Sequence, residues 1–547
     1  MRHARHPPAC FKLNVTPTET ASPTASHLRT PGASTSATAP TDQTAPLLTP
    51  GEFRAATAAM MMTILLAALD QTIVSVAVPT IARQLDGFEW MAWVISGYLI
   101  ASTVVTPLYG KLSDSIGRRR VMTIAILIFL VASVACAMAQ TLPQLVIARV
   151  LQGAGGGGLI ATAQSVIADI VPLRERGRYQ SYVSIVWAVA SMLGPIVGGV
   201  LTEYLSWPWI FWINLPVGAL ALGLVHSSLR TLPTRPRSSG RMPRIDAVGA
   251  ALLLSGLTAF LIPITRVGQG TPWGDSWNLI GWTAAGALLV MFVMQERRHP
   301  DAIVPMTLFA DRTVVACYAI LFICIFNFIA LSVLVPLRVQ LVAGFTAADA
   351  GIHLLPMTLA IPFAAFVSGR WLQRTGRVLP LQRAGALLVP IALLIVGFTK
   401  ATGLVPAIAL VLVGLGMGLQ MPTTLITVQQ SVPRNQIGTV TALTSFFRLL
   451  GGAVGIAVLS SVLLLLLRGH LGADVSPTGS HALDGEGLGH LLDVARAGVP
   501  SEAPIDLAFQ WVMRLSAAIA MTSLWFVARL PDLRLHDEAP APAKAGR

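Results

Sequence analysis

Residues 110–120 read GKLSDSIGRRR, a short basic segment between two apolar stretches. A weaker copy, GRWLQRTGR, starts 259 residues later at Gly369 and also lies between apolar stretches. The glycines allow tight turns between closely packed helices, and the arginines favour the cytoplasmic side of a membrane. The two segments therefore indicate a membrane protein that is built from a duplicated unit.

The apolar stretches on either side have the length of a membrane-spanning helix, which is about 20 residues. Of the 547 residues, 54% are hydrophobic and only 12% are charged, whereas roughly a quarter of the residues of soluble domains are charged. A transmembrane β-barrel would show alternating segments of about ten residues, which this sequence lacks. Because backbone in lipid must satisfy its own hydrogen bonds, these stretches predict helices. A water-soluble protein is excluded.

About 14 transmembrane helices are expected. They cover residues 55–79, 90–109, 121–139, 142–168, 179–201, 208–229, 246–265, 278–295, 313–337, 349–369, 381–399, 404–428, 438–467 and 505–528. Lys and Arg gather in alternate connections, such as 110–120, 174–178 and 230–244, which are therefore predicted to be cytoplasmic. Both termini then lie inside, and the protein is expected in the inner (cytoplasmic) membrane.

Internal matches define the duplication. The segment GAGGG at 153–157 matches GLGMG at 414–418, and SVAVP at 75–79 matches SVLVP at 332–336. The stretch 246–295 has no counterpart. The predicted organisation is a disordered cytoplasmic tail (1–54), an N-terminal six-helix bundle (55–229), a cytoplasmic linker (230–245), a two-helix insert (246–295), a second cytoplasmic linker (296–312), a C-terminal six-helix bundle (313–530) with an external loop near 469–504, and a cytoplasmic tail (531–547).

The net charge of +13 does not predict a nucleic-acid partner, because the basic residues lie between hydrophobic spans and not on a folded basic surface. Three of the four cysteines lie in apolar spans, and Cys10 lies in the N-terminal tail. We therefore expect no disulfide and no metal site. No G-x-x-x-x-G-K-[ST] motif occurs, so an ATP-driven pump is not indicated.

The segment 110–120 resembles the signature loop of the major facilitator superfamily. The resemblance implies a gate between the two halves of the protein, which opens when the acid of this loop loses its contact with basic groups or a helix N-terminus. The gating residues carried over are Gly110, Asp114, Gly117, Arg118 and Arg119. The alternative is a basic loop that only faces the cytoplasm.

Two segments carry intramembrane charge. LDQTIVSVAVP from Leu69 resembles the first-span motif of the drug-antiporter families, with Ser75 where Asn is usual, and RVLQGAG from Arg149 resembles their R-x-x-Q-G-x-G motif. Ionisable groups in hydrocarbon are costly, so Asp70 and Arg149 are predicted to couple proton movement to transport. The repeat counterpart of Arg149 is Leu410. A structural Asp70, and an Arg149 that is held by backbone carbonyls, remain alternatives.

Four residues are predicted along the substrate path: Gln152, Gly194, Pro195 and Arg448. The segment ASMLGPIVGG from Ala190 resembles the antiporter motif G-x-x-x-G-P-x-x-G-G, in which Pro kinks the helix and small residues allow close packing. A kink that serves packing only is the alternative.

WPWIFWINLP from Trp207 resembles a motif of fourteen-span exporters. Its tryptophans also fit an interfacial belt. Asn214 and Pro216 are expected to have a structural role at the start of the sixth span.

Taken together, the motifs make the chain similar to the fourteen-span drug:proton antiporters of the major facilitator superfamily. The resemblance implies an all-α fold of two six-helix bundles and export of small, lipophilic or cationic compounds by alternating access, as in multidrug efflux and antibiotic resistance. It also implies a monomer in the lipid bilayer that uses the proton gradient, with no cofactor and no enzymatic activity. The alternatives are a narrow exporter of one metabolite or self-made antibiotic, and a non-transporting membrane sensor.

Overall fold

The computed structural model describes residues 49–85, 90–172, 175–229, 246–268, 271–299, 302–345, 347–433, 436–471 and 502–532. In these ranges, 14 helical segments are long and apolar enough to cross a membrane. This is the predicted number, and the chain is a multi-pass membrane protein with an all-α fold. Cys136, Cys317 and Cys324 are buried and free, and Cys10 lies outside the described residues.

The elements follow one another in the order that the repeat predicts. The first half contains α1 (Pro50–Gln84), α2 (Met91–Ile116), α3 (Arg118–Ala137), α4 (Leu142–Ile170), α5 (Arg176–Tyr204), α6 (Trp209–Trp212) and α7 (Asn214–Ser228). Two helices follow, α8 (Ala247–Gly268) and α9 (Ser276–Glu296). The second half contains η2 (Met306–Phe309), α10 (Arg312–Ala343), α11 (Ala347–Ile352), α12 (Leu355–Thr375), α13 (Leu379–Phe398), α14 (Leu404–Gln430), α15 (Ile437–Leu471) and α17 (Glu502–Ala528).

Helix α1 begins earlier than the sequence predicts, so residues 50–54 belong to the helix and not to the tail. Thr49 caps the helix: its side chain accepts from the backbone N–H of Glu52, and Glu52 accepts from the backbone N–H of Thr49 in return. This capping box satisfies backbone donors that a helix start leaves free. The remaining predicted tails, the first linker and most of the external loop fall outside the described residues.

Two predicted spans are each made of two helices. The span near 208–229 consists of α6 and α7, which are separated by Ile213, and the span near 349–369 consists of α11 and α12. Pro356 stands in the first turn of α12, where its missing N–H is not needed and where the preceding residue is biased away from helix. Proline therefore sets the second of these breaks.

The glycine-rich segments make equivalent contacts in the two halves. A Cβ on Gly153 or Gly157 would meet the backbone of α2, and one on Gly155 would meet the backbone of α3. In the second half, Gly414 and Gly418 lie in the same way against α12, while Gly416 lies against α13. Small residues allow such close approach between helices in lipid, so each glycine segment fixes the central helix of its own half.

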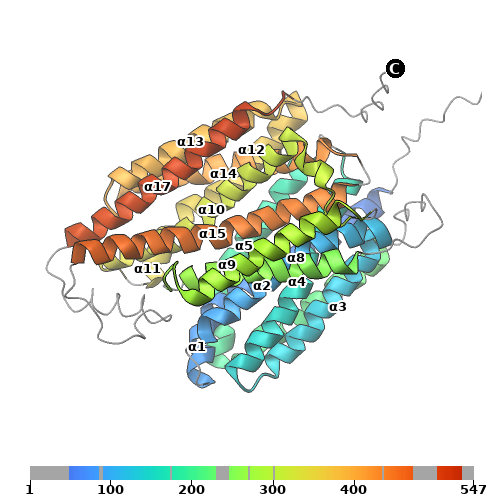
Figure 1. Ribbon diagram of the computed structural model, residues 1–547, viewed down its shortest axis with the longest axis horizontal. Helices are drawn as coiled ribbons and strands as arrows, with labels where there is room; N and C mark the ends of the chain where they lie inside the picture. The colour runs from blue at the N-terminus through green and yellow to red at the C-terminus, as the bar shows by residue number, and fades with distance from the viewer. Residues whose placement is uncertain are drawn as a thin grey trace, which may run out of the picture. The chain divides into compact units, whose positions relative to one another are not determined.

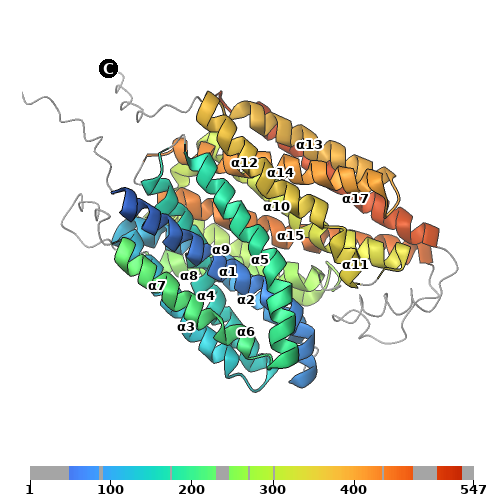
Figure 2. The ribbon, with the colours of Figure 1, turned by 180° about the vertical axis from the view of Figure 1, so that it is seen from behind.

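The halves meet along two pairs of helices. Helix α2 packs against α15, and α5 packs against α12; Figure 1 and Figure 2 show these pairs from opposite sides. Helix α8 packs on both α2 and α15, and α9 packs on α8 (Figure 1). The insert therefore covers one of the two lines along which the halves meet.

Candidate functional site: a buried ion pair in the first half

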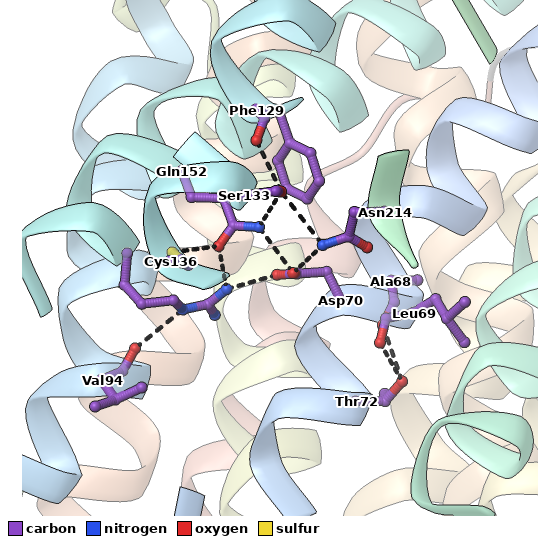
Figure 3. A network of polar contacts seen from close by, with 11 residues as sticks. Ala68, Leu69, Asp70, Thr72, Val94, Phe129, Ser133, Cys136, Gln152 and Asn214 are labelled. Carbon is purple, nitrogen blue, oxygen red and sulfur yellow. Dashed lines mark hydrogen bonds and ion pairs between the residues drawn. The ribbon is translucent and has the colours of Figure 1, made fainter. Parts of the chain in front are cut away.

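The two charges predicted for proton coupling lie together inside the first half (Figure 3). Asp70 comes from the middle of α1 and is 0% exposed, and Arg149 comes from α4 and is 2% exposed. An Arg149 Nη1 donates to Asp70 Oδ2 at 2.7 Å. Because the free energy of burying either charge alone is unfavourable, each explains the position of the other.

Gln152, predicted for the substrate path, belongs to the same site. It lies one helical turn after Arg149, so both side chains project from one face of α4. Its Nε2 donates to Asp70 Oδ1 at 2.9 Å, and its Oε1 accepts from Arg149 Nη1 at 2.6 Å. The amide thus bridges the two charged groups, and the structure places Gln152 in the ion-pair site.

Two further members of the site are not among the predicted site residues. Asn214, the first residue of α7, donates from Nδ2 to Asp70 Oδ1 at 2.8 Å, and Ser133 of α3 accepts from Gln152 Nε2 at 2.8 Å (Figure 3). Asn214 also donates to Ser133 Oγ at 3.3 Å. The signal that could have identified Asn214 is a strong hydrogen-bonding amide within an otherwise apolar span. We call Asp70, Ser133, Arg149, Gln152 and Asn214 the ion-pair cluster.

Arg149 makes additional contacts with α2. Its Nε donates to the backbone carbonyl of Val94 at 3.3 Å, and its guanidinium carbon lies 4.3 Å from the centre of the Tyr98 ring. Such stacking is a favourable cation–π contact. The carbonyl-held arginine and the arginine paired with Asp70 are therefore the same arrangement, in which α1, α2 and α4 meet at one guanidinium.

The second half has a neutral counterpart of this site. Asn327 of α10 is related to Asp70 by the repeat offset of 257 residues that the SVAVP match defines. Its Oδ1 accepts from Ser516 of α17 at 2.5 Å, and its Nδ2 donates to the carbonyl of Ile323 at 2.7 Å. The counterpart of Arg149, Leu410, is buried and apolar. The charged pair thus occurs in one half only at these related positions.

The predicted gating residues lie where α2 and α3 approach α15. Asp114 Oδ2 accepts from the backbone N–H of Thr439 at 2.7 Å and from its hydroxyl at 2.9 Å, in the first turn of α15. Arg118 pairs with Asp114 at 2.7 Å and with Asp169 of α4 at 2.9 Å. A carboxylate at a helix N-terminus is favourably placed with respect to the helix dipole, so Asp114 joins the two halves.

The remaining three gating residues have different surroundings. A Cβ on Gly110 would meet Ala442 and the carbonyl of Gly438 in α15, so Gly110 allows the halves to touch. Gly117 separates α2 from α3 with φ +97°, a conformation that favours glycine. Arg119 is placed with its Nη2 2.9 Å from Nδ1 of His226 in α7, within the first half. Their gating roles stay predictions.

The other predicted substrate-path residues lie apart from the ion-pair cluster. A Cβ on Gly194 would meet the side chain of Thr72, so Gly194 lets α5 approach α1 two residues from Asp70. Pro195 follows within α5, and its side chain lies outside the described part of the chain. Arg448 lies in α15 of the second half. The structure therefore brings together Asp70, Arg149 and Gln152, but not the whole predicted path.

Comparisons with known proteins agree with this architecture. The sequence model of the Major Facilitator Superfamily matches residues 60–456. An uncharacterized MFS-type transporter of Mycobacterium tuberculosis is 34% identical over 431 residues, which are 78% of this chain and 62% of that protein. The chain thus spans less than two thirds of that relative's length.

Two other relatives are covered more fully. The multidrug transporter protein MdtP of Bacillus subtilis is 31% identical over 74% of either chain. The efflux pump dotC of Dothistroma septosporum is 33% identical over 73% of this chain and 69% of its own.

A solved structure has the same fold. The human organic anion transporter MFSD10 superimposes with a TM-score of 0.56 over 86% of this chain and 100% of its own, at 18% identity. The match to the family's sequence model extends over most of the chain, and the relatives share about a third of their residues with it. This chain belongs to the major facilitator superfamily.

Proposed function

We propose that this protein is a proton-coupled exporter of small lipophilic compounds that works by alternating access, with Asp70 as the group that binds and releases the proton. The observation that carries the proposal is the ion-pair cluster. Three donors from two helices converge on one carboxylate that is 0% exposed. An ionisable group in the interior of a membrane-spanning bundle is expensive, and such groups are typical of proton pathways.

Protonation of Asp70 would change the balance of forces in the cluster. In the present arrangement the carboxylate accepts from Arg149, Gln152 and Asn214. A proton on Asp70 would cancel its charge and leave the buried guanidinium of Arg149 with neutral partners only. Since a buried charge without a counter-charge is unfavourable, protonation favours a conformation in which α1 and α4 are placed differently.

The contact between the halves gives this local change a route to the gate. Helix α4 carries Arg149 and also Asp169, which pairs with Arg118 beside Asp114. Asp114 in turn holds the first turn of α15. A shift of α4 therefore acts on the Asp114–Thr439 contact, at the end of the molecule that the basic loops predict to be cytoplasmic.

Export is the direction we propose, because relatives at about a third identity are named as a multidrug transporter and an efflux pump. Of the predicted substrate classes, lipophilic compounds fit better than cations. The carboxylate of Asp70 already has a permanent counter-charge in Arg149, so it is not free to select a cation. The proton gradient is the proposed energy source, in the inner membrane, with both termini cytoplasmic and the protein acting as a monomer.

The test is accumulation of a fluorescent lipophilic dye in inverted membrane vesicles that contain the protein, with an imposed pH gradient. We expect accumulation that a protonophore abolishes and that Asp70→Asn removes. Asp506→Asn is the matched control, because Asp506 is also paired with an arginine, Arg338, at 2.8 Å in the second half. Failure to transport any member of a varied dye panel would favour a narrow exporter or a non-transporting sensor.

A further inference from the structure

Arg448 differs in its partners from the other arginines inside the described spans. Arg149 pairs with Asp70, Arg118 with Asp114 and Asp169, and Arg338 with Asp506. Arg448 forms no ion pair and donates no hydrogen bond within the described ranges, and its Nε is buried. Its electrostatic neighbour is the thiol of Cys324 in α10, which is not a carboxylate.

An unpaired guanidinium inside a membrane protein needs an explanation. Arginine keeps its charge under all ordinary conditions, so it cannot adapt to burial by losing a proton. Burial of the charge without a partner is strongly unfavourable in proteins. At a transport site this deficit is removed when an anion binds, and the free energy recovered adds to the affinity for that anion.

Arg448 lies on the inward-facing side of α15. Thr441, Ser445 and Arg448 follow one another at spacings of four and three residues, so they share one face of the helix. Thr441 Oγ1 accepts from Gln429 of α14 at 3.1 Å, which directs this face into the interior. The face that contacts α2 is different, since it carries Thr439 and Ala442.

The surroundings of Arg448 are aromatic and apolar. In α15 the neighbouring residue, Phe447, stacks on Tyr318 of α10 with ring centres 4.8 Å apart. One turn further along, Gly451 lies against the backbone of Phe322. A guanidinium fork beside aromatic rings suits a ligand that has an apolar or aromatic body and one carboxylate, because the fork can bind both carboxylate oxygens.

We propose that Arg448 binds the anionic group of the transported compound, so that the substrates are amphiphilic carboxylates. This inference rests on the proposed transport function and narrows its substrate class. It also argues against cationic substrates, which Arg448 would repel. The ion-pair cluster and Arg448 then divide the work: the first half carries the proton, and the second half carries the charge of the substrate.

The test is binding to the purified full-length protein in detergent, which requires no proton gradient. The probes are dansyl-phenylalanine, a carboxylate, and its methyl ester, which is neutral and almost the same size. We expect the native protein to bind the acid about tenfold more tightly than the ester, which corresponds to one charge-assisted hydrogen-bonded pair. Arg448→Gln should remove this preference by weakening acid binding alone.

Two further variants keep the test informative. Arg448→Lys retains the charge but not the fork, so it should keep part of the preference for the acid. Arg514→Gln is the matched control: Arg514 is partly buried in the same half, but its Nε donates to the carbonyl of Gly397 at 2.9 Å and its Nη2 to Gln510 at 3.1 Å. This variant should leave the acid-to-ester ratio unchanged.

Two results would overturn the assignment of Arg448. One is equal binding of acid and ester by the native protein, and the other is equal weakening of both ligands in Arg448→Gln. Charge-selective binding without gradient-driven transport would support Arg448 and refute the transport proposal. Dye transport that depends on Asp70 but is indifferent to substrate charge would refute Arg448 alone.

Discussion

Asp70 is held by side chains that are far apart in the sequence, and each contact has a different physical role. Arg149 supplies the opposite charge, whereas Gln152 and Asn214 supply neutral donors to Asp70 Oδ1. Ser133 links the two amides, since it accepts from Gln152 and from Asn214 and donates to the carbonyl of Phe129 at 2.9 Å. The ion-pair cluster is thus a network in which the loss of one member leaves others unsatisfied.

Replacement of Asn214 tests whether neutral donors position Asp70. Asn214→Ala should slow gradient-driven dye accumulation about tenfold or more, because a hydrogen bond to a charged group contributes roughly 1.5–3 kcal/mol. Asn327→Ala is the matched control: Asn327 occupies the repeat-related neutral site and is also fully buried. Equal losses of transport in both variants, at equal protein levels, would mean that Asn214 serves folding only.

Replacement of Arg149 tests the energetics of the buried pair. Arg149→Gln leaves the carboxylate of Asp70 buried without its counter-charge, so we expect the free energy of unfolding to fall by about 3–5 kcal/mol. The double variant Asp70→Asn with Arg149→Gln removes both charges and should be more stable than Arg149→Gln alone. Thermal unfolding in detergent measures the order of the midpoints, and a double variant less stable than the single one would contradict the pairing.

At the scale of helices, glycines set how closely the two halves approach. Gly177 near the start of α5 and Gly369 in α12 lie against each other, since a Cβ on Gly177 would come within 2.7 Å of the Gly369 Cα. Gly110 and Gly438 form the corresponding approach between α2 and α15. The repeat offsets relate Gly110 to Gly369 and Gly177 to Gly438, so the same contact occurs twice, on the side predicted to be cytoplasmic.

A larger side chain at this approach should separate the halves. Gly177→Val would place atoms where the backbone of Gly369 lies, and we expect it to shift the population towards a conformation that is open at this end. The measurement is the distance between spin labels on Arg120→Cys and Arg374→Cys, both exposed, in a background without the four native cysteines. The expected result is a longer distance.

Gly199→Val is the control for that shift. Gly199 belongs to the same helix, but a Cβ on it would meet no other atom within 4 Å. The substitution should therefore leave the label distance as in the parent protein. An unchanged distance in Gly177→Val as well would show that the glycine contact does not determine how the halves are spaced.

For the molecule as a whole, the sequence predicts the number of spans well because the membrane imposes a length on every helix. It predicts helix ends less well: α1 starts at Pro50 because of the Thr49–Glu52 capping box, and Pro356 stands at the start of a separate helix. The unpaired insert follows from the repeat. Its position on α2 and α15 does not, because α8 and α9 have no repeat-related partner from which a contact could be inferred.

The site shows the same limit. Asp70 and Arg149 can be singled out from the sequence, because a charge within an apolar span requires an explanation. Asn214 is uncharged and lies 144 residues from Asp70, and the rotation of α7 relative to α1 depends on packing that one sequence does not reveal. The lack of a partner for Arg448 likewise becomes visible only when the neighbouring helices are in place.

The proposal that Asp70 carries the coupled proton is tested most directly by comparing two activities of Asp70→Asn in proteoliposomes. One is dye accumulation driven by a pH gradient, and the other is exchange of internal for external dye without any gradient. We predict that Asp70→Asn loses gradient-driven accumulation and retains exchange, because only the coupling to protons is removed. Gradient-driven accumulation that persists in Asp70→Asn would contradict the proposal.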